Sequence, residues 1–308
     1  MTTHIASLDY HRTAMLLSTV LAASLWCQTK SLLADERTYS YGPNECQSRG
    51  TLLQWSYGTS FSGGPNLDEP LVTDRPDFTE ASSTVGRGVA QLEFGYTYLD
   101  DQGDSERTQI HSYGETLLRL GVLADWLELR FALFPLVRQT TTGGMTDSTG
   151  GLADLYLGVK LGLTPQEGIL PEMALIPQMF VPSGSNAFTS GQVEPGVNWI
   201  YSWEINDLLS TAGSTQVNRR LENSGASYVR VAQSWTLAYS LTDRLGAYTE
   251  WFSLIPNGAE TFRTQSFFNG GFTFLLSDDV QWDIRAGVGL NDAADDFFTG
   301  TGLSIRLR

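Results

Sequence analysis

The sequence has 308 residues, with 34 acidic and 19 basic side chains and a formal net charge of −15. Only 17% of the residues are charged, whereas 11% are aromatic and 31 are glycine, a composition that favours strands joined by tight turns over helices. Lys30 and Lys160 are the two lysines. This acidic chain therefore offers no basic patch for nucleic acid, and its two cysteines exclude a disulfide scaffold or a four-cysteine zinc site.

The N-terminus has the features of an export signal. Arg12 precedes an apolar stretch, Thr13 to Trp26, that is too short to span a bilayer as a helix. Residues 1–34 are therefore predicted to be a signal peptide, cleaved after Ser24 or Ala34. A lipoprotein anchor at Cys27 is the weaker alternative, because the bulky Trp26 precedes it. Residues 35–70 are rich in Ser, Gly, Asn and Pro and predict a periplasmic linker of low order.

From residue 88 onward, tight turns recur at regular spacing. Each of four turns places an Asp two residues after an aliphatic residue, and Asp stabilises turns by accepting hydrogen bonds from its own backbone. The turns begin at Leu123, Ile205, Leu241 and Leu276, and the segment starting at Leu163 fills the one wide gap. A hairpin every 35 to 42 residues results.

The connections at the opposite strand ends are longer and more polar. We expect them at 100–109, 139–150, 183–191, 219–225, 257–261 and 291–296. Short turns at one end and long loops at the other are typical of outer-membrane barrels, which have an even number of strands. The expected strands are 88–99, 110–122, 126–138, 151–163, 171–182, 191–204, 207–218, 226–241, 244–255, 262–276, 280–290 and 297–308.

These segments alternate apolar and polar residues with a period of two. The alternation predicts that Leu129, Leu157 and Ile284 face lipid while Arg130, Asp154 and Asp283 face the interior. A secreted soluble β-protein would show the same alternation with the apolar face inward. The export signal, the loop asymmetry and aromatic residues near strand ends favour the membrane; these residues are Trp126, Trp199, Trp203, Trp235, Trp251, Phe297 and Phe298. The predicted fold class is therefore all-β, a single up-and-down antiparallel transmembrane β-barrel of about 12 strands.

Several segments resemble a known family. TDRPDFTE at Thr73–Glu80 and the final block from Gly287 to Arg308 are its most specific motifs, and the similarity covers about Leu71 to Arg308. The sequence is similar to outer-membrane transporters labelled putative MetA-pathway of phenol degradation. The resemblance implies an outer-membrane barrel that passes small aromatic or apolar compounds. One departure is the terminal Leu307-Arg308, since the insertion machinery commonly reads an aromatic residue there.

The predicted inward face carries polar side chains that could line a solute pathway or close it by pairing. Seven are acidic and six basic, so a lumen lined by them has no reason to select strongly by charge. The set comprises Glu93, Glu115, Arg119, Glu128, Arg130, Asp154, Lys160, Glu194, Asn198, Arg230, Glu250, Asp283, Arg285 and Arg306.

The TDRPDFTE segment precedes the first strand and is predicted to fold into the periplasmic mouth of the barrel. There Asp74, Arg75, Asp77 and Glu80 would partner interior charges and narrow the pore. A plain turn leading into the strand is the simpler alternative. A calcium site at these carboxylates is disfavoured because no glycine-bearing twelve-residue loop is present, and no metal or other cofactor is predicted.

Enzyme function is not expected. A lipid hydrolase needs a Ser with a His base, and after signal removal only His111 remains, beside Ser112 and predicted to face inward. The predicted function is passage of small solutes, aromatic or weakly apolar, across the outer membrane of a double-membraned bacterium. The alternative is a non-conducting structural or adhesive barrel closed by charge pairs. Expected partners are outer-membrane lipid, small-molecule solutes and the barrel-insertion machinery.

Overall fold

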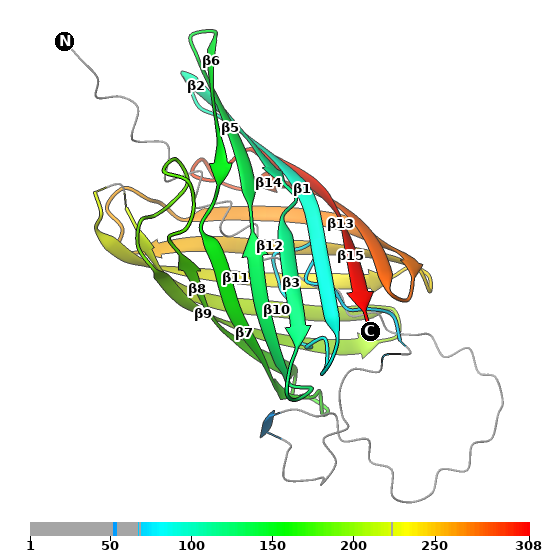
Figure 1. Cartoon of the computed structure of the whole chain (residues 1–308). Coiled ribbons are helices and arrows are strands. Elements are labelled where there is room, and N and C mark those ends of the chain that lie inside the picture. Colours follow the sequence, from blue (N-terminus) through cyan, green and yellow to red (C-terminus); the bar gives the residue numbers. More distant parts are fainter. Residues whose placement is uncertain (1–51, 54–66, 68, 223) are drawn as a thin grey trace, which may run out of the picture.

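The computed structural model describes residues 52, 53, 67, 69–222 and 224–308. The predicted signal peptide, Cys27 and nearly all of the predicted linker lie outside these residues. The described part is all β (Figure 1). Its strands are β1 (Ala90–Gln102), β2 (Glu106–Tyr113), β3 (Thr116–Gly121), β4 (Leu127–Leu133), β5 (Pro135–Thr142), β6 (Met145–Leu152), β7 (Leu155–Thr164), β8 (Glu172–Val181), β9 (Glu194–Asn206), β10 (Leu209–Leu221), β11 (Ser227–Ser240), β12 (Leu245–Asn257), β13 (Gln265–Ser277), β14 (Val280–Gly289) and β15 (Phe297–Leu307).

The strands close into an antiparallel barrel with twelve strand positions around its wall. β1 pairs with β15 from Ala90↔Leu307 to Asp100↔Phe297, which joins the two ends of the sheet. β1 also pairs with β2 along one half and with β3 along the other, so β2 and β3 together form one interrupted strand of the barrel wall. β4 with β5, and β6 with β7, are interrupted in the same way. The prediction of an up-and-down barrel of about 12 strands is confirmed.

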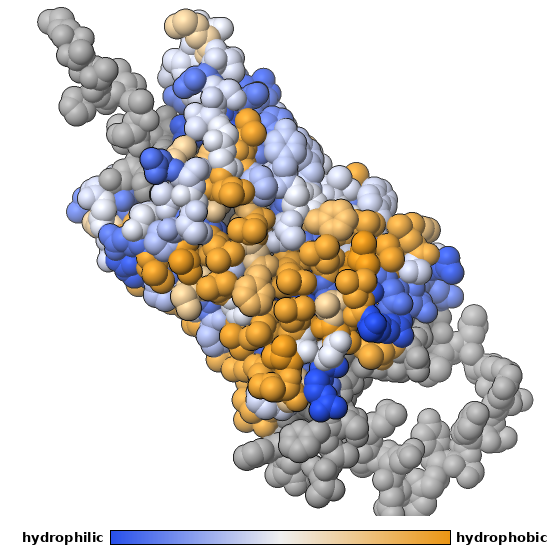
Figure 2. Space-filling view, viewed as in Figure 1, coloured by the Kyte–Doolittle hydropathy of each residue, from blue (hydrophilic) through white to orange (hydrophobic). Residues whose placement is uncertain are grey.

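Two of the predicted loops are hairpins of extended strand. Loops were expected at 100–109 and 139–150, but β1 and β2 continue to Gln102 and Glu106, and β5 and β6 continue to a two-residue turn at Gly143-Gly144. Both glycines have positive φ, 57° and 84°, which a tight hairpin turn of this kind requires. Threonines at 140–142 favour strand over loop. These two extended hairpins carry mostly hydrophilic residues and project beyond the apolar surface (Figure 2).

The break between β2 and β3 shifts the inward–outward alternation by one residue. Ser112 is buried on one side of the break and Glu115 on the other, while Gly114 and Glu115 both have positive φ, 76° and 22°. His111 consequently lies on the outer face, where its Nδ1 is 2.7 Å from the Tyr96 hydroxyl. The expectation that His111 faces inward was wrong. It assumed that the inward–outward alternation of Glu115 and Arg119 continues without a shift to residue 111, whereas the break shifts it by one residue.

The outer surface of the barrel is an apolar belt. Trp282, Ile284 and Val288, at alternate positions of β14, are 40–44% exposed, whereas the intervening Asp283 is fully buried. Figure 2 shows hydrophobic residues gathered over the wall of the barrel on the face in view, with hydrophilic residues toward its ends. Tyr201, Trp203 and Trp235 form an outer aromatic cluster, but Phe298 is 1% exposed and lies inside. Among the described residues, no helix is long and apolar enough to cross a membrane.

Candidate functional site

A stretch of chain before β1 occupies the interior of the barrel. Residues 71–85, named here the inner segment, are buried except Val72 and Ser83. The Leu71 amide donates to the Asp278 carbonyl at the β13–β14 turn, and the Arg87 amide, just beyond the segment, donates to Asp125 at the β3–β4 turn. Both ends are thus fixed at the short-turn end, which in outer-membrane barrels faces the periplasm. The middle of the segment reaches further into the barrel than the mouth position expected from the sequence.

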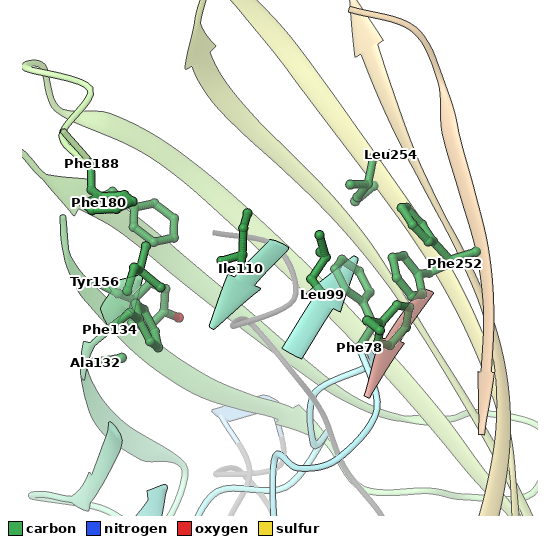
Figure 3. Close-up of a cluster of buried hydrophobic side chains, with 14 of the residues drawn as sticks. Phe78, Leu99, Ile110, Ala132, Phe134, Tyr156, Phe180, Phe188, Phe252 and Leu254 are labelled. Atoms are coloured by element: carbon green, nitrogen blue, oxygen red, sulfur yellow. The ribbon is translucent and has the colours of Figure 1, made fainter. Parts of the chain in front are cut away.

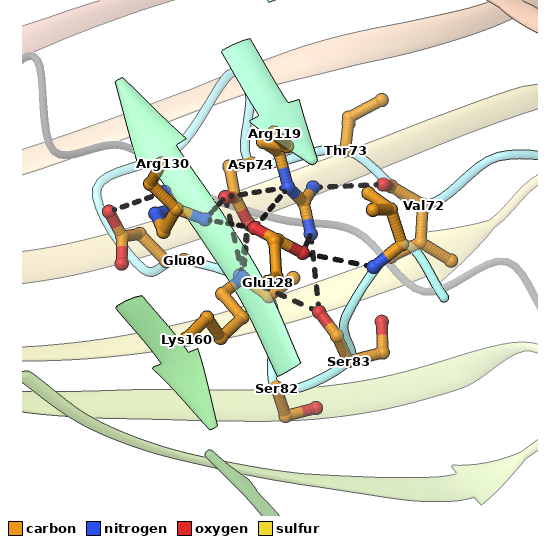
Figure 4. Close-up of polar contacts among 12 residues, drawn as sticks. Val72, Thr73, Asp74, Glu80, Ser82, Ser83, Arg119, Glu128, Arg130 and Lys160 are labelled. Atoms are coloured by element: carbon orange, nitrogen blue, oxygen red, sulfur yellow. Dashed lines mark hydrogen bonds and ion pairs between the residues drawn. The ribbon is translucent and has the colours of Figure 1, made fainter. Parts of the chain in front are cut away.

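Asp74 lies at the centre of a buried ionic network (Figure 4). Its carboxylate is 3.0 Å from Nζ of Lys160 and 3.4 Å from Nε of Arg119, and it also accepts from Arg130. Three further carboxylates complete the network: Glu128 and Glu93 lie 2.9 and 3.1 Å from Arg119, and Glu80 lies 3.1 Å from Arg130. Buried charges need such pairing, because a single partner rarely repays the cost of desolvation.

Arg75 connects the inner segment to the opposite part of the wall. Its guanidinium is 2.8 Å from Glu115 and 3.2 Å from Asp283. Gly95 on β1 and Gly302 on β15 pair across the sheet at this point, and a Cβ on either would lie 2.2–2.7 Å from Arg75 side-chain atoms. Glycine at both positions therefore lets the guanidinium lie directly against the wall.

The tip of the inner segment binds one carboxylate of β12. Glu250 accepts from the amides of Phe78 and Thr79, at 2.7 and 2.8 Å, and from the Thr79 hydroxyl at 2.8 Å. The same hydroxyl lies 2.6 Å from that of Ser234 on β11. Polar contacts of the segment thus reach residues of β1, β3, β4, β7, β8, β9, β11, β12 and β14.

A cluster of buried, largely apolar side chains adjoins the tip and is named here the inner apolar cluster. The Phe78 ring stacks on Phe252 with centroids 4.5 Å apart and planes 7° apart, and Phe252 in turn stacks on Phe267 at 4.7 Å. Figure 3 shows Phe78 and Phe252 together with a second aromatic group that contains Phe134, Tyr156 and Phe180. The residues of the inner apolar cluster are Phe78, Leu99, Ile110, Leu117, Ala132, Phe134, Leu136, Tyr156, Phe180, Phe188, Ala232, Phe252, Leu254, Phe267, Ala294 and Phe298. None of these was a predicted site residue, although the inward parity of Phe252, Phe267 and Phe180 is visible in the sequence.

The remaining predicted residues hold local structure around this interior. Asp154 accepts from the amides of Gly184 and Ser190, at 3.0 and 2.9 Å, in the loop that carries Phe188. Asn198 donates to Glu80 at 3.1 Å, and Arg285 donates to the Pro76 carbonyl at 2.6 Å. Arg306 lies 2.7 Å from Asp279 at the short-turn end.

All eighteen predicted site residues are buried, each at 6% exposure or less. They do not form one site. Glu93, Arg119, Glu128, Arg130 and Lys160 surround Asp74, whereas Glu194 and Arg230 lie near the long-loop end of the barrel. The acids of the inner segment are shared among separate partners, and no three metal-ligating side chains group as a metal site within the described residues.

Arg220 is a functional candidate that was missed. The seventh strand was expected to end at 218, so Arg220 fell in a predicted loop, but β10 runs to Leu221 and buries Arg220 to 4% exposure. Its guanidinium pairs with Glu194 and lies 4.5 Å from the centroid of the Phe180 ring. The alternation of Gln216, Asn218 and Arg220 was the signal that could have revealed it.

The closed barrel, its apolar outer belt and its charged interior define an outer-membrane β-barrel protein. The family comparison is consistent with this class: residues 73–307 match the model described as "Putative MetA-pathway of phenol degradation". The chain belongs to this family.

Solved structures were also compared. The crystal structure of the COG4313 outer membrane channel from Pseudomonas putida F1 matches with a TM-score of 0.58 and 13% identity, over 73% of this chain and 98% of that one. The NanC porin matches with a TM-score of 0.44 and 10% identity, over 71% and 100% of the two chains. The KdgM porin matches with 0.41 and 8%, over 70% and 99%. The first match shows a common fold. No curated protein matches the sequence significantly.

Proposed function

We propose that this protein is a passive outer-membrane channel for small solutes, preferring aromatic or weakly apolar ones. The observation that carries the proposal is the inner apolar cluster, which lies inside a barrel whose outer face is also apolar. An interior that served only to hold the wall together could be filled by paired charges alone, as around Asp74. Instead, Phe78, Phe252 and Phe267 present stacked rings within the lumen. The printed name of the structurally similar P. putida protein, an outer membrane channel, supports the same function.

The inner segment is, on this proposal, a fixed constriction. Its contacts with strands all around the wall make displacement costly, because each release would leave buried polar groups without partners. Solutes would pass beside the segment at Phe78 rather than by expelling it. Phe78→Ala should therefore increase the rate at which neutral solutes cross, because the Phe78 ring is the part of the segment that packs on the inner apolar cluster.

The alternative is a non-conducting structural or adhesive barrel. The specific observation in its favour is the complete burial of Arg119, Lys160 and Glu128. All three contact the inner segment inside the barrel, the two bases through Asp74 and Glu128 through the Val85 amide. Liposome swelling separates the two functions. The refolded protein should admit small neutral sugars, and both Phe78→Ala and deletion of residues 71–80 should admit them faster. Absence of swelling with all three proteins would contradict the channel function and favour the non-conducting barrel.

The proposal includes how the protein reaches the membrane. Residues 1–34 would be removed on export, residues 35–70 would link the new N-terminus to the inner segment, and the insertion machinery would fold the barrel into outer-membrane lipid. N-terminal sequencing of the protein purified from outer membranes tests the cleavage position. No enzymatic activity or cofactor is proposed.

A further inference from the structure

The long-loop half of the interior contains a cluster of hydrogen-bond donors. Gln216, Asn218 and Arg220 occupy alternate inward positions of β10 and are exposed by 1–4%. Arg230 on β11 is opposite Asn218 in the register and fully buried. Because Arg220 is opposite Tyr228, the two arginines are diagonal neighbours, with Cβ atoms about 7–8 Å apart in a sheet of this kind. These four residues are named the donor patch.

Three N–H groups of the patch have no acceptor among the described residues. They are Nε2 of Gln216, Nδ2 of Asn218 and Nε of Arg220. Buried donors are paired in nearly all folded proteins, so three on successive inward positions of one strand are unusual. The nearby carboxylates are already engaged: Glu194 accepts from Arg220 and the Leu221 amide, and Glu222 accepts from the amides of Glu260 and Thr261. The patch is therefore suited to an acceptor brought in by a solute.

An aromatic wall adjoins these donors. The Arg220 guanidinium lies over the Phe180 ring, and Phe180 contacts Tyr156 with centroids 5.5 Å apart. The Tyr156 hydroxyl donates to Oε1 of Gln178, and Nε2 of Gln178 donates to Oδ1 of Asn218. The Asn218 amide is thereby oriented with its Nδ2 donor directed away from Gln178. Phe180 and Tyr156 belong to the same apolar cluster as Phe188 and Phe134. A planar ring could pack on this wall while its substituent reached the donor patch.

The two features together indicate one chemical class of ligand. We propose, building on the channel function, that the donor patch and aromatic wall form a binding site for small aromatic anions such as carboxylates or sulfonates. The anionic oxygens accept from Asn218, Arg220 and Arg230, and the ring packs on Phe180 and Tyr156. Although charges balance over the whole predicted interior, this end of it carries Arg220 and Arg230 on neighbouring strands, and Glu194 pairs with Arg220. Arg220 lies near the long-loop end of β10, so a solute from outside meets the site before the inner segment.

Direct binding tests the site independently of conduction. The probe is benzenesulfonate, which stays anionic throughout the useful pH range, added to the refolded full chain in neutral-detergent micelles and followed by saturation-transfer NMR of its ring protons. Binding should be saturable and absent from empty micelles. Phenyltrimethylammonium, with the ring but the opposite charge, and methanesulfonate, with the anion but no ring, should each compete at least tenfold more weakly.

Arg230→Gln should weaken benzenesulfonate binding at least tenfold. Arg219→Gln is the matched control, because Arg219 is the neighbour of Arg220 and bonds instead to Val193 and Gln192. Asn218→Asp is a second test variant, which keeps the oxygen that accepts from Gln178 but replaces the donor by a negative charge. Folding of each is checked by resistance to unfolding in cold SDS. If Arg230→Gln does not fold, Asn218→Asp carries the test.

Equal binding by wild type and by the folded test variants, or equal competition by phenyltrimethylammonium, would overturn the anion site. The channel function is judged separately, by swelling with neutral sugars. Benzenesulfonate binding without sugar passage would contradict only the channel function, whereas sugar passage without benzenesulfonate binding would contradict only the anion site.

Discussion

Asp74 of the inner segment lies 3.0 Å from Nζ of Lys160, the only lysine of the barrel wall. Both side chains are fully buried. The carboxylate also accepts from the Ala81 amide at 2.8 Å, which folds the segment back on itself. One aspartate therefore shapes the inner segment and anchors it to β7, so the ion pair couples the segment to the wall.

Lys160→Met should destabilise the folded protein by about 3 kcal/mol, because it removes one partner of a buried ion pair. Unfolding by urea after refolding in lipid vesicles measures the change. Adding Asp74→Asn should recover part of the loss, because the carboxylates of the network already outnumber its bases and the second substitution removes one of them. If the two substitutions were simply additive, the coupling between the segment and β7 would be negligible.

Gly302→Ala should displace Arg75, because the added Cβ would lie 2.2 Å from its Nε. Overpacking of this kind costs about 1–3 kcal/mol. Gly162→Ala is the matched control, since its Cβ would meet its nearest neighbours at 3.7 Å, an ordinary contact. The same unfolding measurement compares the two variants, and equal stability of both would show that Arg75 can relax without loss.

Ile284→Arg places a charge in the apolar belt and should cost about 2–4 kcal/mol if the residue lies near the bilayer midplane. Thr149→Arg, in the hydrophilic extension of β6, is the control and should change the free energy of unfolding little. If arginine were tolerated at position 284 and costly at position 149, the membrane would surround a different part of the barrel from the apolar belt assigned here.

The alternation of apolar and polar residues was sufficient to predict the twelve strand positions of the barrel, because a two-residue period survives local irregularities. It did not predict the side that His111 faces, since the positive φ angles at Gly114 and Glu115 shift the parity without interrupting the sheet. Nor did it place Arg220, because a polar run at the end of β10 resembles a loop when only hydropathy is considered.

The partners of the inner segment could not be predicted from local sequence. Phe78 binds Glu250, and Asp74 binds Lys160, across separations of 172 and 86 residues. A run of acids before the first strand indicates an affinity for basic groups, but which arginine each acid meets depends on how the closed barrel brings distant strands together. The inner apolar cluster was not predicted for a related reason, since single inward phenylalanines from separate strands come together only after closure.

The last prediction tests whether the inner segment moves during transport. The Thr79 and Ser234 hydroxyl oxygens lie 2.6 Å apart, so cysteines at both positions are placed to form a disulfide between the segment and β11. The native Cys46 is replaced by alanine in this variant and in its single-cysteine controls. If the segment is a fixed constriction, oxidation should leave liposome swelling with neutral sugars within about twofold of the reduced value. The physical reason is that Glu250 already accepts hydrogen bonds from the Thr79 amide and hydroxyl. The disulfide would therefore restrain a residue that is already held in place. A large fall in passage on oxidation, restored by reductant and absent from the single-cysteine controls, would instead make the inner segment a moving gate.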